Sequence, residues 1–366
     1  MTAIWLKRLL DADWLSAQLG RDVTASRLRV KPMTSITAAV ETRDGQPAGW
    51  VRLLWPKSRT KAAKTERAAA HLGLSTSQRD LDGVTLQAGP VLADPKLLGR
   101  LHAAGEAGLI GPWQPELVLR YNPQRRVVLR QGRTIVRVTA SVHPLRVAFD
   151  RFVAQTVPTP ERLDDGGLQG ISVYAFTGDG DLAALPDPNA AAAVGRAVAK
   201  LHATTNIPQD QRVELVGRGL DPLQQARIHA RLLNVLAPEL AQRVRMVARR
   251  LRISPTATPV LSHGDLSPDQ VLVDSGNVWL TDFDRACLAP RAADLGSFLA
   301  VVDDATGARF LDGYQLGGGI LPSSEALRQA VAGSLVLRAI DPLRLASPTW
   351  ESEVAANLDR VAEVLA

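Results

Sequence analysis

The sequence predicts an α+β protein with two lobes, a β-rich front half and a mainly helical back half. The chain has 366 residues, of which 46% are hydrophobic, which is enough to fill two cores. Short β-type runs separated by turns extend to about Phe176, and apolar residues recur at helical spacing after Gly178. We expect the lobes to meet at "VYAFTGDGDLAALPD", where Gly and Asp residues indicate a hinge.

In the front half, four runs are typical of strands: "RLRVKPMTSITAAVET", "GWVRLLWP", "LVLRYNPQRRVVLRQ" and "RTIVRVTA". The first pair and the second pair share an order, namely a basic strand, an x-Pro turn and further strands with an Arg among apolar residues. This order indicates either a duplicated β-hairpin unit or a coincidence among short runs, and the sequence leaves both open.

In the back half, "NAAAAVGRAVAKLHA" and "DPLQQARIHARLLNVLAPELAQRVRMVARRLR" predict helices, the second interrupted at Pro238. Two more helices are predicted in "SEALRQAVAGSLVLRAI" and "ESEVAANLDRVAEVLA". The N-terminal stretch "MTAIWLKRLLDADWLSAQLG" also has apolar residues at helical spacing, with charges between them, which differs from a signal peptide.

Composition excludes several classes of protein. The net charge is +6, but the basic residues are dispersed and aromatic residues make up only 4%, so we expect no nucleic-acid partner. No apolar run reaches the ~18 residues of a membrane span. The single Cys287 excludes an intrachain disulfide and a Cys-based metal cluster. We therefore expect a cytoplasmic protein without a membrane partner, and the sequence leaves its oligomeric state open.

Two polar clusters adjoin predicted strands, "LSHGDLSPDQVLV" at 261–273 and "LTDFDRA" at 280–286. Gly and Pro predict a loop before the first strand, and "DSGN" predicts a hairpin turn between the strands. Such a hairpin would hold Asp265 and Asp282 on the same side of a cleft, with Gln270 between them. Carboxylate and amide oxygens suit Mg²⁺, which commonly shares its remaining positions with substrate phosphates. The clusters therefore indicate a phosphoryl-transfer site.

"HGDLSPDQVLV" and "WLTDFDRACLAPRAADLGSFLA" resemble the catalytic and metal-binding segments of the aminoglycoside phosphotransferase and choline kinase-like family, a branch of the protein-kinase-like fold. Two weaker matches stand upstream in the same order. "VYAFTGDGDLAAL" is similar to the hinge after the nucleotide-binding lobe, and "AVGRAVAKLHA" is similar to the helix that ends in Leu-His. Together the matches cover residues 172–300.

The resemblance implies a small-molecule kinase that transfers the γ-phosphoryl group of ATP or GTP to a hydroxyl of a sugar, an antibiotic or a related metabolite. Asp265 would be the catalytic base, while Gln270 and Asp282 would hold Mg²⁺ on the nucleotide phosphates. His263 and Asp294 would support the catalytic loop.

Three further residues near these motifs have expected roles. Asp284 would reach the metal or a substrate, or would satisfy loop amides, and both interpretations stay open. The hinge match implies that Tyr174 and Phe176 lie beside the bound nucleotide.

The chain departs from the family pattern at two positions. Gln270 stands where the family usually has Asn, but its oxygen is the same kind of ligand on a longer side chain. The second departure is the missing phosphate-binding Lys, because no Lys occurs between Lys96 and Lys200. Arg137 takes the corresponding place, and Arg52 is its counterpart in the first unit.

The sequence also leaves open which acidic residue pairs with the Arg that takes the place of this Lys. The nearest candidates are Asp150 in the second unit and Glu66 in the first.

The resemblance also implies three parts. Residues 1–117 would form an N-terminal cap segment with a β-hairpin unit, similar to the extra segment of maltokinase-like bacterial kinases. Residues 118–178 would form the nucleotide-binding β-rich lobe with the hinge, and 179–366 the helical catalytic and acceptor-binding lobe. The cap would either cover the nucleotide lobe or present a regulatory or oligomerisation surface.

Two other functions stay open at this point. The missing Lys would fit a pseudokinase or ligand-binding module without turnover. The sequence "WLTDFDRA" also fits the Asp-x-Asp of a haloacid dehalogenase-type phosphatase, although "HGDLSPDQ" would then have no role.

The sequence indicates the acceptor substrate less clearly than it indicates the reaction. Residues 203–259, which line the acceptor pocket in the family, carry mainly Arg among their charged residues, which argues against a polycationic aminoglycoside. A sugar, a nucleoside-type antibiotic or a hydroxylated metabolite fits better, unless these Arg residues form a solvated helix face.

Overall fold

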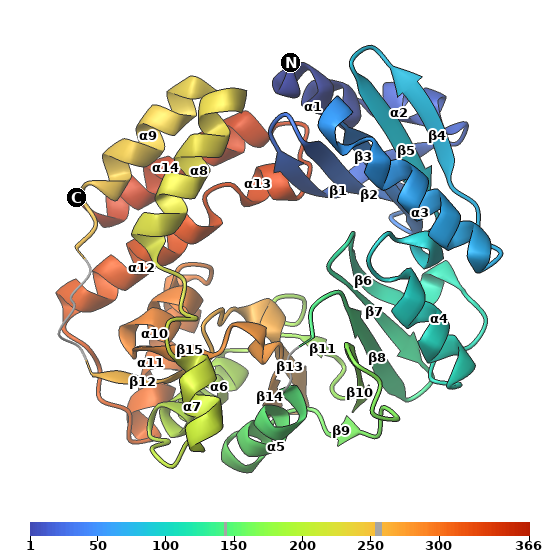
Figure 1. The fold of residues 1–366 in the computed structure, drawn as a ribbon. Helices are drawn as coiled ribbons and strands as arrows, with labels where there is room; N and C mark the ends of the chain where they lie inside the picture. The colour runs from blue at the N-terminus through green and yellow to red at the C-terminus, as the bar shows by residue number, and fades with distance from the viewer. Residues whose placement is uncertain (143–144, 253–257) are drawn as a thin grey trace.

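The computed structural model describes residues 1–142, 145–252 and 258–366. Its three parts are two β-sheet units and a mainly helical lobe, and they are arranged around a central cavity (Figure 1). The two sheets follow each other along the chain, and the first of them also lies beside the C-terminal helices. The α+β class and the division into a β-rich front and a helical back are confirmed.

The first unit begins with two helices and continues as a five-stranded antiparallel sheet of order β1-β2-β3-β5-β4. Its elements are α1 (Thr2–Leu10), α2 (Ala12–Leu19), β1 (Val23–Lys31), β2 (Ser35–Thr42), β3 (Pro47–Leu54), α3 (Thr60–His71), β4 (Ser77–Leu81) and β5 (Val84–Gly89). The helix α4 (Leu98–Glu106) connects it to the second unit.

The second unit repeats this topology, with sheet order β6-β7-β8-β10-β9 and one helix between its third and fourth strands. Its elements are β6 (Val118–Asn122), β7 (Arg126–Gln131), β8 (Thr134–Thr139), α5 (Arg146–Thr156), β9 (Arg162–Leu163) and β10 (Ile171–Ala175). Arg52 on β3 and Arg137 on β8 therefore occupy the same place in two sheets of the same design.

The rest of the chain forms the helical lobe with two small sheets, β11-β13-β14 and β12-β15. The helices are α6 (Pro188–His202), α7 (Gln209–Leu215), α8 (Pro222–Leu236), α9 (Pro238–Ala248), α10 (Ala292–Leu299), α11 (Asp304–Leu316), α12 (Ser324–Arg338), α13 (Asp341–Arg344) and α14 (Trp350–Val364). The strands are β11 (Gly180–Asp181), β12 (Pro259–Ser262), β13 (Val271–Asp274), β14 (Asn277–Leu280) and β15 (Cys287–Pro290). No helix in the described ranges has the length and hydrophobicity needed to cross a bilayer.

Local sequence signals explain several of these boundaries. The long predicted helix is interrupted at Pro238, which opens α9 because it lacks the N–H that a continuing helix needs. Asp187, Asp221 and Ser323 cap α6, α8 and α12 with side-chain oxygens that accept backbone N–H bonds.

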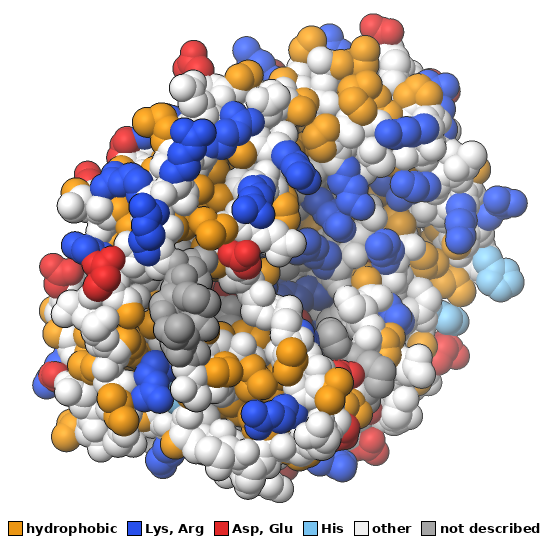
Figure 2. Space-filling model, turned by 60° about the vertical axis from the view of Figure 1, so that its left-hand side comes forward, with side chains coloured by type: hydrophobic (Ala, Val, Ile, Leu, Met, Phe, Trp, Pro, Cys, Tyr) orange, Lys and Arg blue, Asp and Glu red, His pale blue; other side chains and the backbone are white. Residues whose placement is uncertain are grey.

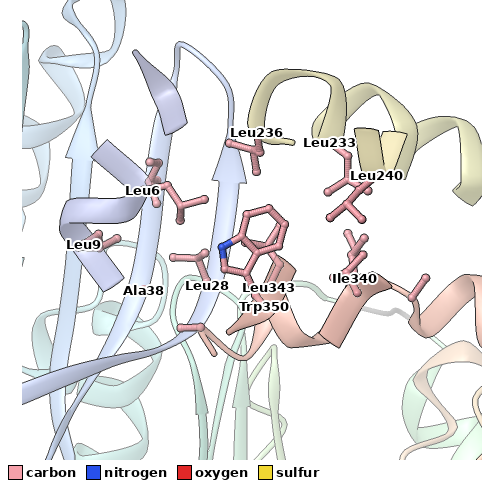
Figure 3. Close-up of a cluster of buried hydrophobic side chains, with 14 of the residues drawn as sticks. Leu6, Leu9, Leu28, Ala38, Leu233, Leu236, Leu240, Ile340, Leu343 and Trp350 are labelled. Carbon is pink, nitrogen blue, oxygen red and sulfur yellow. The ribbon is translucent and has the colours of Figure 1, made fainter. Parts of the chain in front are cut away.

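The first unit and the C-terminal helices share one hydrophobic core. Leu6 of α1 and Leu28 of β1 belong to the same cluster as Leu236 of α8, Leu343 of α13 and Trp350 of α14 (Figure 3). All five side chains are less than a tenth exposed. Hydrophobic burial therefore joins the N-terminal unit to the C-terminal helices, so that the two ends of the chain share one core.

Candidate functional site

The loop between β12 and β13 is held in place by one buried carboxylate. Asp294, at the start of α10, accepts the backbone N–H bonds of His263 (2.7 Å) and Gly264 (2.9 Å) and lies 3.1 Å from Nε2 of His202. Burial alone would raise the pKa of Asp294, but the hydrogen bonds from His202 and Gly264 outweigh burial. The net pKa is below the ordinary value, so Asp294 stays ionised. The positions of His263 and Asp294 agree with a supporting role.

The backbone at Gly264 must turn in a way that only glycine accommodates. Its φ is +79°, and a Cβ atom there would lie 2.1 Å from the carbonyl oxygen of Arg285. Next to it, Nε2 of His263 lies 2.7 Å from the carbonyl oxygen of Thr281. The catalytic loop is thus connected directly to the strand end that carries Asp282.

The hairpin predicted at "DSGN" is present, with Asp274 paired to Asn277 across the turn. The N–H of Thr281 donates to the carbonyl oxygen of Gln270 (2.9 Å), and the Thr281 hydroxyl donates to the same oxygen (3.1 Å). Asp282 follows at once with φ +60°, a left-handed conformation that few residues other than glycine adopt. These bonds place Gln270 and Asp282 at the same end of the hairpin.

Asp265 lies at the edge of the cavity between two guanidinium groups. Nε of Arg285 is 3.5 Å from Oδ2 and Nη2 of Arg338 is 3.8 Å from Oδ1. Burial raises the pKa of Asp265 above its ordinary value, and the charges of Arg285 and Arg338 act against that increase. A carboxylate with a raised pKa accepts a proton more readily, which suits a general base.

Arginine side chains from the second sheet contact the Asp-x-Asp pair. Nη1 of Arg126 donates to both oxygens of Asp282 (2.9 and 2.7 Å), and Nη2 of Arg137 donates to one of them (3.3 Å). Arg137 also binds both oxygens of Asp284, and Arg146 binds one. Burial raises the pKa of Asp284, but the charges of Arg137 and Arg146 outweigh it and hold the pKa well below its usual range.

Arg137 lines the central cavity, as the alternation along β8 predicts. Its acidic partners differ from the expected one: Asp282 and Asp284 bind it, whereas Asp150 on α5 pairs with Arg146 and Arg162 and accepts the Tyr174 hydroxyl at 2.8 Å. The expectation that Asp150 is its partner is therefore corrected.

The expectation that Arg52 contacts a nucleotide is also corrected. Arg52 is buried inside the first unit and lies outside the cavity lining. Its guanidinium donates to Gln87 (3.0 and 2.6 Å), to the Thr65 hydroxyl (2.8 Å) and to the Lys61 carbonyl (2.8 Å). Glu66 is exposed on α3, and its carboxylate does not pair with Arg52. Burial lowers the pKa of Arg52 to about 10.

The structure does not bring the two hinge aromatics to the cavity lining. Tyr174 is held by Asp150 through its hydroxyl, and the guanidinium of Arg130 covers the Phe176 ring at 3.8 Å from the ring centre. Their expected place beside the nucleotide stays a prediction.

The donor chemistry of the hairpin end fits a magnesium ion. Asp282 offers carboxylate oxygens that are ion-paired with Arg126 and Arg137, and Gln270 offers an amide oxygen of the same hard character. Among the described residues no three His, Cys, Asp or Glu side chains gather as a metal site, so such an ion would complete its coordination with oxygens of water or of a phosphate. Arg126 would have to leave Asp282 for the carboxylate to bind a metal.

The cavity beside these residues has a volume of about 1740 Å³, larger than the ~300–1,000 Å³ of a typical single-ligand pocket. Its walls come from β1, the β6–β7 hairpin, β8, α8, the catalytic loop, α12 and α13. Lys and Arg side chains gather around the hollow on this face (Figure 2).

Several residues in or near the site were missed by sequence reasoning. Arg126 follows the x-Pro turn of "YNPQRR", and this pair of basic residues at a hairpin tip was the available signal. His202, the His of the Leu-His match, is buried and contacts the Asp294 carboxylate and the Tyr314 hydroxyl. Arg218 donates to the Asp284 carbonyl oxygen at 2.8 Å.

Most of the Arg residues of segment 203–259 are exposed, and four of them lie on α8 and α9, as one of the two interpretations of that segment expected. Arg227 and Arg231, for example, are exposed and lie outside the cavity lining. The basic side chains that do line the cavity come mainly from other elements.

A family model described as the phosphotransferase enzyme family (APH) matches residues 109–332, more than half of the chain. A choline/ethanolamine kinase family protein from Mesorhizobium loti has a similar fold, with 18% identity, a TM-score of 0.53, and 73% of this chain and 93% of that chain covered. The APH(2″) phosphotransferase solved with GDP and kanamycin gives 15% identity, a TM-score of 0.51, and coverage of 73% and 99%. No curated protein sequence matches the chain.

The solved structures support the fold, and the family model adds the chemistry. The matched residues include the loop between β12 and β13, the β13–β14 hairpin, and Asp294, which holds the backbone of that loop. The haloacid dehalogenase interpretation is thereby excluded, because the Asp-x-Asp follows a strand of a small antiparallel sheet inside this match. The chain belongs to the phosphotransferase enzyme family, with the protein-kinase-like fold, and is a phosphotransferase whose acceptor is an alcohol group.

Proposed function

We propose that this chain transfers the γ-phosphoryl group of ATP or GTP to a hydroxyl of a sugar, an antibiotic or a related metabolite. The observation that carries the proposal is the position of Asp265 on the wall of a cavity that Asp282 also lines. Hydrogen bonds from the His263 ring to the Thr281 carbonyl and from the Thr281 hydroxyl to the Gln270 carbonyl join the loop that carries Asp265 to the strand end that carries Asp282. A proton acceptor and a phosphate-side carboxylate in one large cavity are what phosphoryl transfer needs.

In this proposal the Asp265 carboxylate accepts the proton of the acceptor hydroxyl. The acceptor oxygen forms a bond to the γ-phosphorus, the bond to the β-phosphate oxygen breaks, and the nucleoside diphosphate leaves. Arg137 offsets negative charge on the phosphates as a fork-shaped donor in place of the missing Lys. A Mg²⁺ ion held by Gln270 and Asp282, when bound, would neutralise phosphate charge.

The base is tested by Asp265→Asn, which removes the proton acceptor and keeps the shape. We expect turnover to fall by roughly 10²-fold or more while nucleotide affinity stays close to that of the wild type. The assay is release of ADP or GDP with a library of hydroxylated metabolites and antibiotics, which would also identify the acceptor. A variant with wild-type turnover would remove Asp265 from the mechanism.

The metal ligands are tested by a pair of substitutions. Asp282→Ala should abolish Mg²⁺-dependent nucleotide binding, whereas Gln270→Asn should retain much of it because the ligand oxygen is preserved. Calorimetric titration of ATP with and without Mg²⁺ measures both variants. If neither substitution changes binding, the metal assignment is wrong.

A second candidate is a pseudokinase, and a specific contact favours it. Both oxygens of Asp282 accept hydrogen bonds from Arg126, which occupies the carboxylate that a metal would need. A pseudokinase would bind ligands in the cavity without releasing a nucleoside diphosphate. Release of nucleoside diphosphate by the wild type distinguishes the two functions, and Arg126→Met tests the contact: if the pair blocks the site, this variant should bind Mg²⁺–nucleotide more tightly than the wild type.

A further inference from the structure

The lining of the central cavity carries more Lys and Arg than Asp and Glu side chains. Most of its carboxylates are committed around the catalytic loop. Asp282 and Asp284 are paired with Arg126 and Arg137, and Asp294 holds the loop backbone. The basic side chains on the opposite wall therefore lack a comparable set of partners.

Two of these basic side chains come from β1 of the N-terminal unit. Arg27 and Arg29 line the cavity at a β-bulge, where the pairing register of β1 with β2 shifts between Ser26 and Arg29. Arg27 has a φ of +49°, a conformation that costs energy in a residue other than glycine. Bulges commonly redirect side chains beside functional sites. Neither Arg27 nor Arg29 has a carboxylate within ion-pair distance in the described part of the chain.

Three more arginines face the same space from other elements. Arg125 lies in the β6–β7 turn, Arg285 directly follows the Asp-x-Asp pair, and Arg344 ends α13, which packs against β1. Arg344 is paired with Asp341 at 2.8 Å. Arg285 connects the group to the reaction centre, because its Nε is 3.5 Å from the Asp265 carboxylate.

The donor nucleotide does not explain this second group. Arg126 and Arg137 lie beside Asp282 and Asp284, where the phosphates of a nucleotide are proposed to bind. Arg27 and Arg29 belong instead to the unit that the family model does not match, since the match begins at residue 109. The cavity volume of about 1740 Å³ leaves room for a second ligand between β1 and Asp265.

We propose that the acceptor is an anionic hydroxylated small molecule, and that Arg27, Arg29, Arg125 and Arg285 bind its phosphate or carboxylate group while its hydroxyl reaches Asp265. This inference rests on the proposed kinase function and names the substrate class of the same site. Guanidinium forks match the oxygens of either anion in bidentate geometry. A polycationic acceptor would be repelled by the same wall.

The electrostatics of the cluster support this assignment. The pKa of Arg125 is lowered by burial and then by the charges of Arg29, Arg285, Arg344 and Arg126. Positive charges so close together destabilise one another until an anion offsets them. Binding an anion would therefore relieve repulsion that the protein carries in its unliganded state.

The test uses inorganic phosphate as the probe and separates the two sites. The wild type is saturated with AMP-PNP and Mg²⁺ to fill the donor site, and phosphate is then titrated by calorimetry. The double variant Arg27→Gln/Arg29→Gln removes two unpaired charges, so it leaves no buried carboxylate without a partner. The double variant Arg227→Gln/Arg231→Gln removes two exposed charges outside the cavity and serves as the matched control.

We expect the phosphate dissociation constant to rise about ten- to a hundredfold in Arg27→Gln/Arg29→Gln, with AMP-PNP affinity unchanged, and to stay at the wild-type value in the control. Equal phosphate affinity in both double variants, or no measurable phosphate binding by the wild type, overturns the assignment. A parallel loss of AMP-PNP affinity also overturns it, because the cluster would then belong to the donor site. Failure of the wild type to bind AMP-PNP refutes the kinase proposal separately.

The acceptor assay completes the test. Glucose 6-phosphate, gluconate, glucose and kanamycin represent a phosphate monoester, a carboxylate, a neutral sugar and a polycation. ADP release with either anionic compound, reduced in Arg27→Gln/Arg29→Gln mainly through a higher KM, supports the proposal and identifies the anion. Turnover with glucose or kanamycin alone contradicts it.

Discussion

Removal of the Asp294 carboxylate should destabilise the whole catalytic lobe. In Asp294→Ala the backbone N–H groups of His263 and Gly264 lose their acceptor, the first in a buried place and the second in a partly buried one. Each unsatisfied buried donor costs about 1–3 kcal/mol, and the partly buried one costs less, so the two together cost at most about 6 kcal/mol of the ~5–15 kcal/mol that stabilises a typical domain. Asp294→Asn keeps the shape and one acceptor oxygen, so its cost should be about 1–3 kcal/mol.

Asp303→Ala is the matched control, because Asp303 is a carboxylate that caps α11 at the surface and accepts one N–H bond from Thr306 at 2.7 Å. Its loss should cost much less than the loss of the buried Asp294 carboxylate, because only one cap bond at the surface is removed. The free energy of unfolding is measured by urea titration with far-UV circular dichroism. If Asp294→Ala and Asp303→Ala differ by less than about 1 kcal/mol, the carboxylate does not hold the loop in the way described.

Three other predictions test separate parts of the structure. Burial, and then the Arg344 charge, lowers the pKa of His229 to about 4. The unfolded chain therefore binds this proton at higher pH than the folded chain, and the free energy of unfolding falls as the pH drops from ~6.5 towards 4, by at most about 3 kcal/mol. His229→Gln should flatten this pH dependence in urea titrations at several pH values. Gly195→Ala puts a Cβ atom 2.1 Å from the Phe310 carbonyl oxygen between α6 and α11 and should lower the melting temperature, whereas Gly99→Ala on α4, with open space around it, should raise it. Arg137→Ala should weaken Mg²⁺–ATP binding about ten- to a hundredfold in calorimetry, whereas Arg52→Met should lower stability and leave that affinity unchanged.

The catalytic hairpin could be predicted from sequence because its signals are local. Gly264 and the "DSGN" turn demand particular backbone conformations, and the adjoining apolar runs form strands whatever else the chain does. The helices α6, α8 and α9 were predictable for a similar reason, since their apolar spacing and the proline at Pro238 act within a few turns. For these segments, neighbours along the chain carry the information.

The partners of the charged residues could not be predicted from sequence. Arg52 and Arg137 occupy the same place in two sheets of the same topology, yet Arg52 is bound to neutral groups and Arg137 to two carboxylates. Asp150, the nearest acid in sequence terms, pairs with other arginines. Ion pairs join residues far apart in the chain, and only the packed arrangement of lobes decides which charges meet.

By itself, the sequence determined the α+β class, the catalytic and hairpin motifs and the family resemblance, because periodicity, turn residues and motif spacing are properties of short segments. The tertiary structure alone decided that the N-terminal unit shares a core with the C-terminal helices, as Leu28 and Trp350 show. That contact brings Arg27 and Arg29 to the cavity that holds Asp265. Apolar faces on both ends of the chain were visible in the sequence, but hydrophobic burial is non-directional, so their pairing depended on the shape of the whole fold.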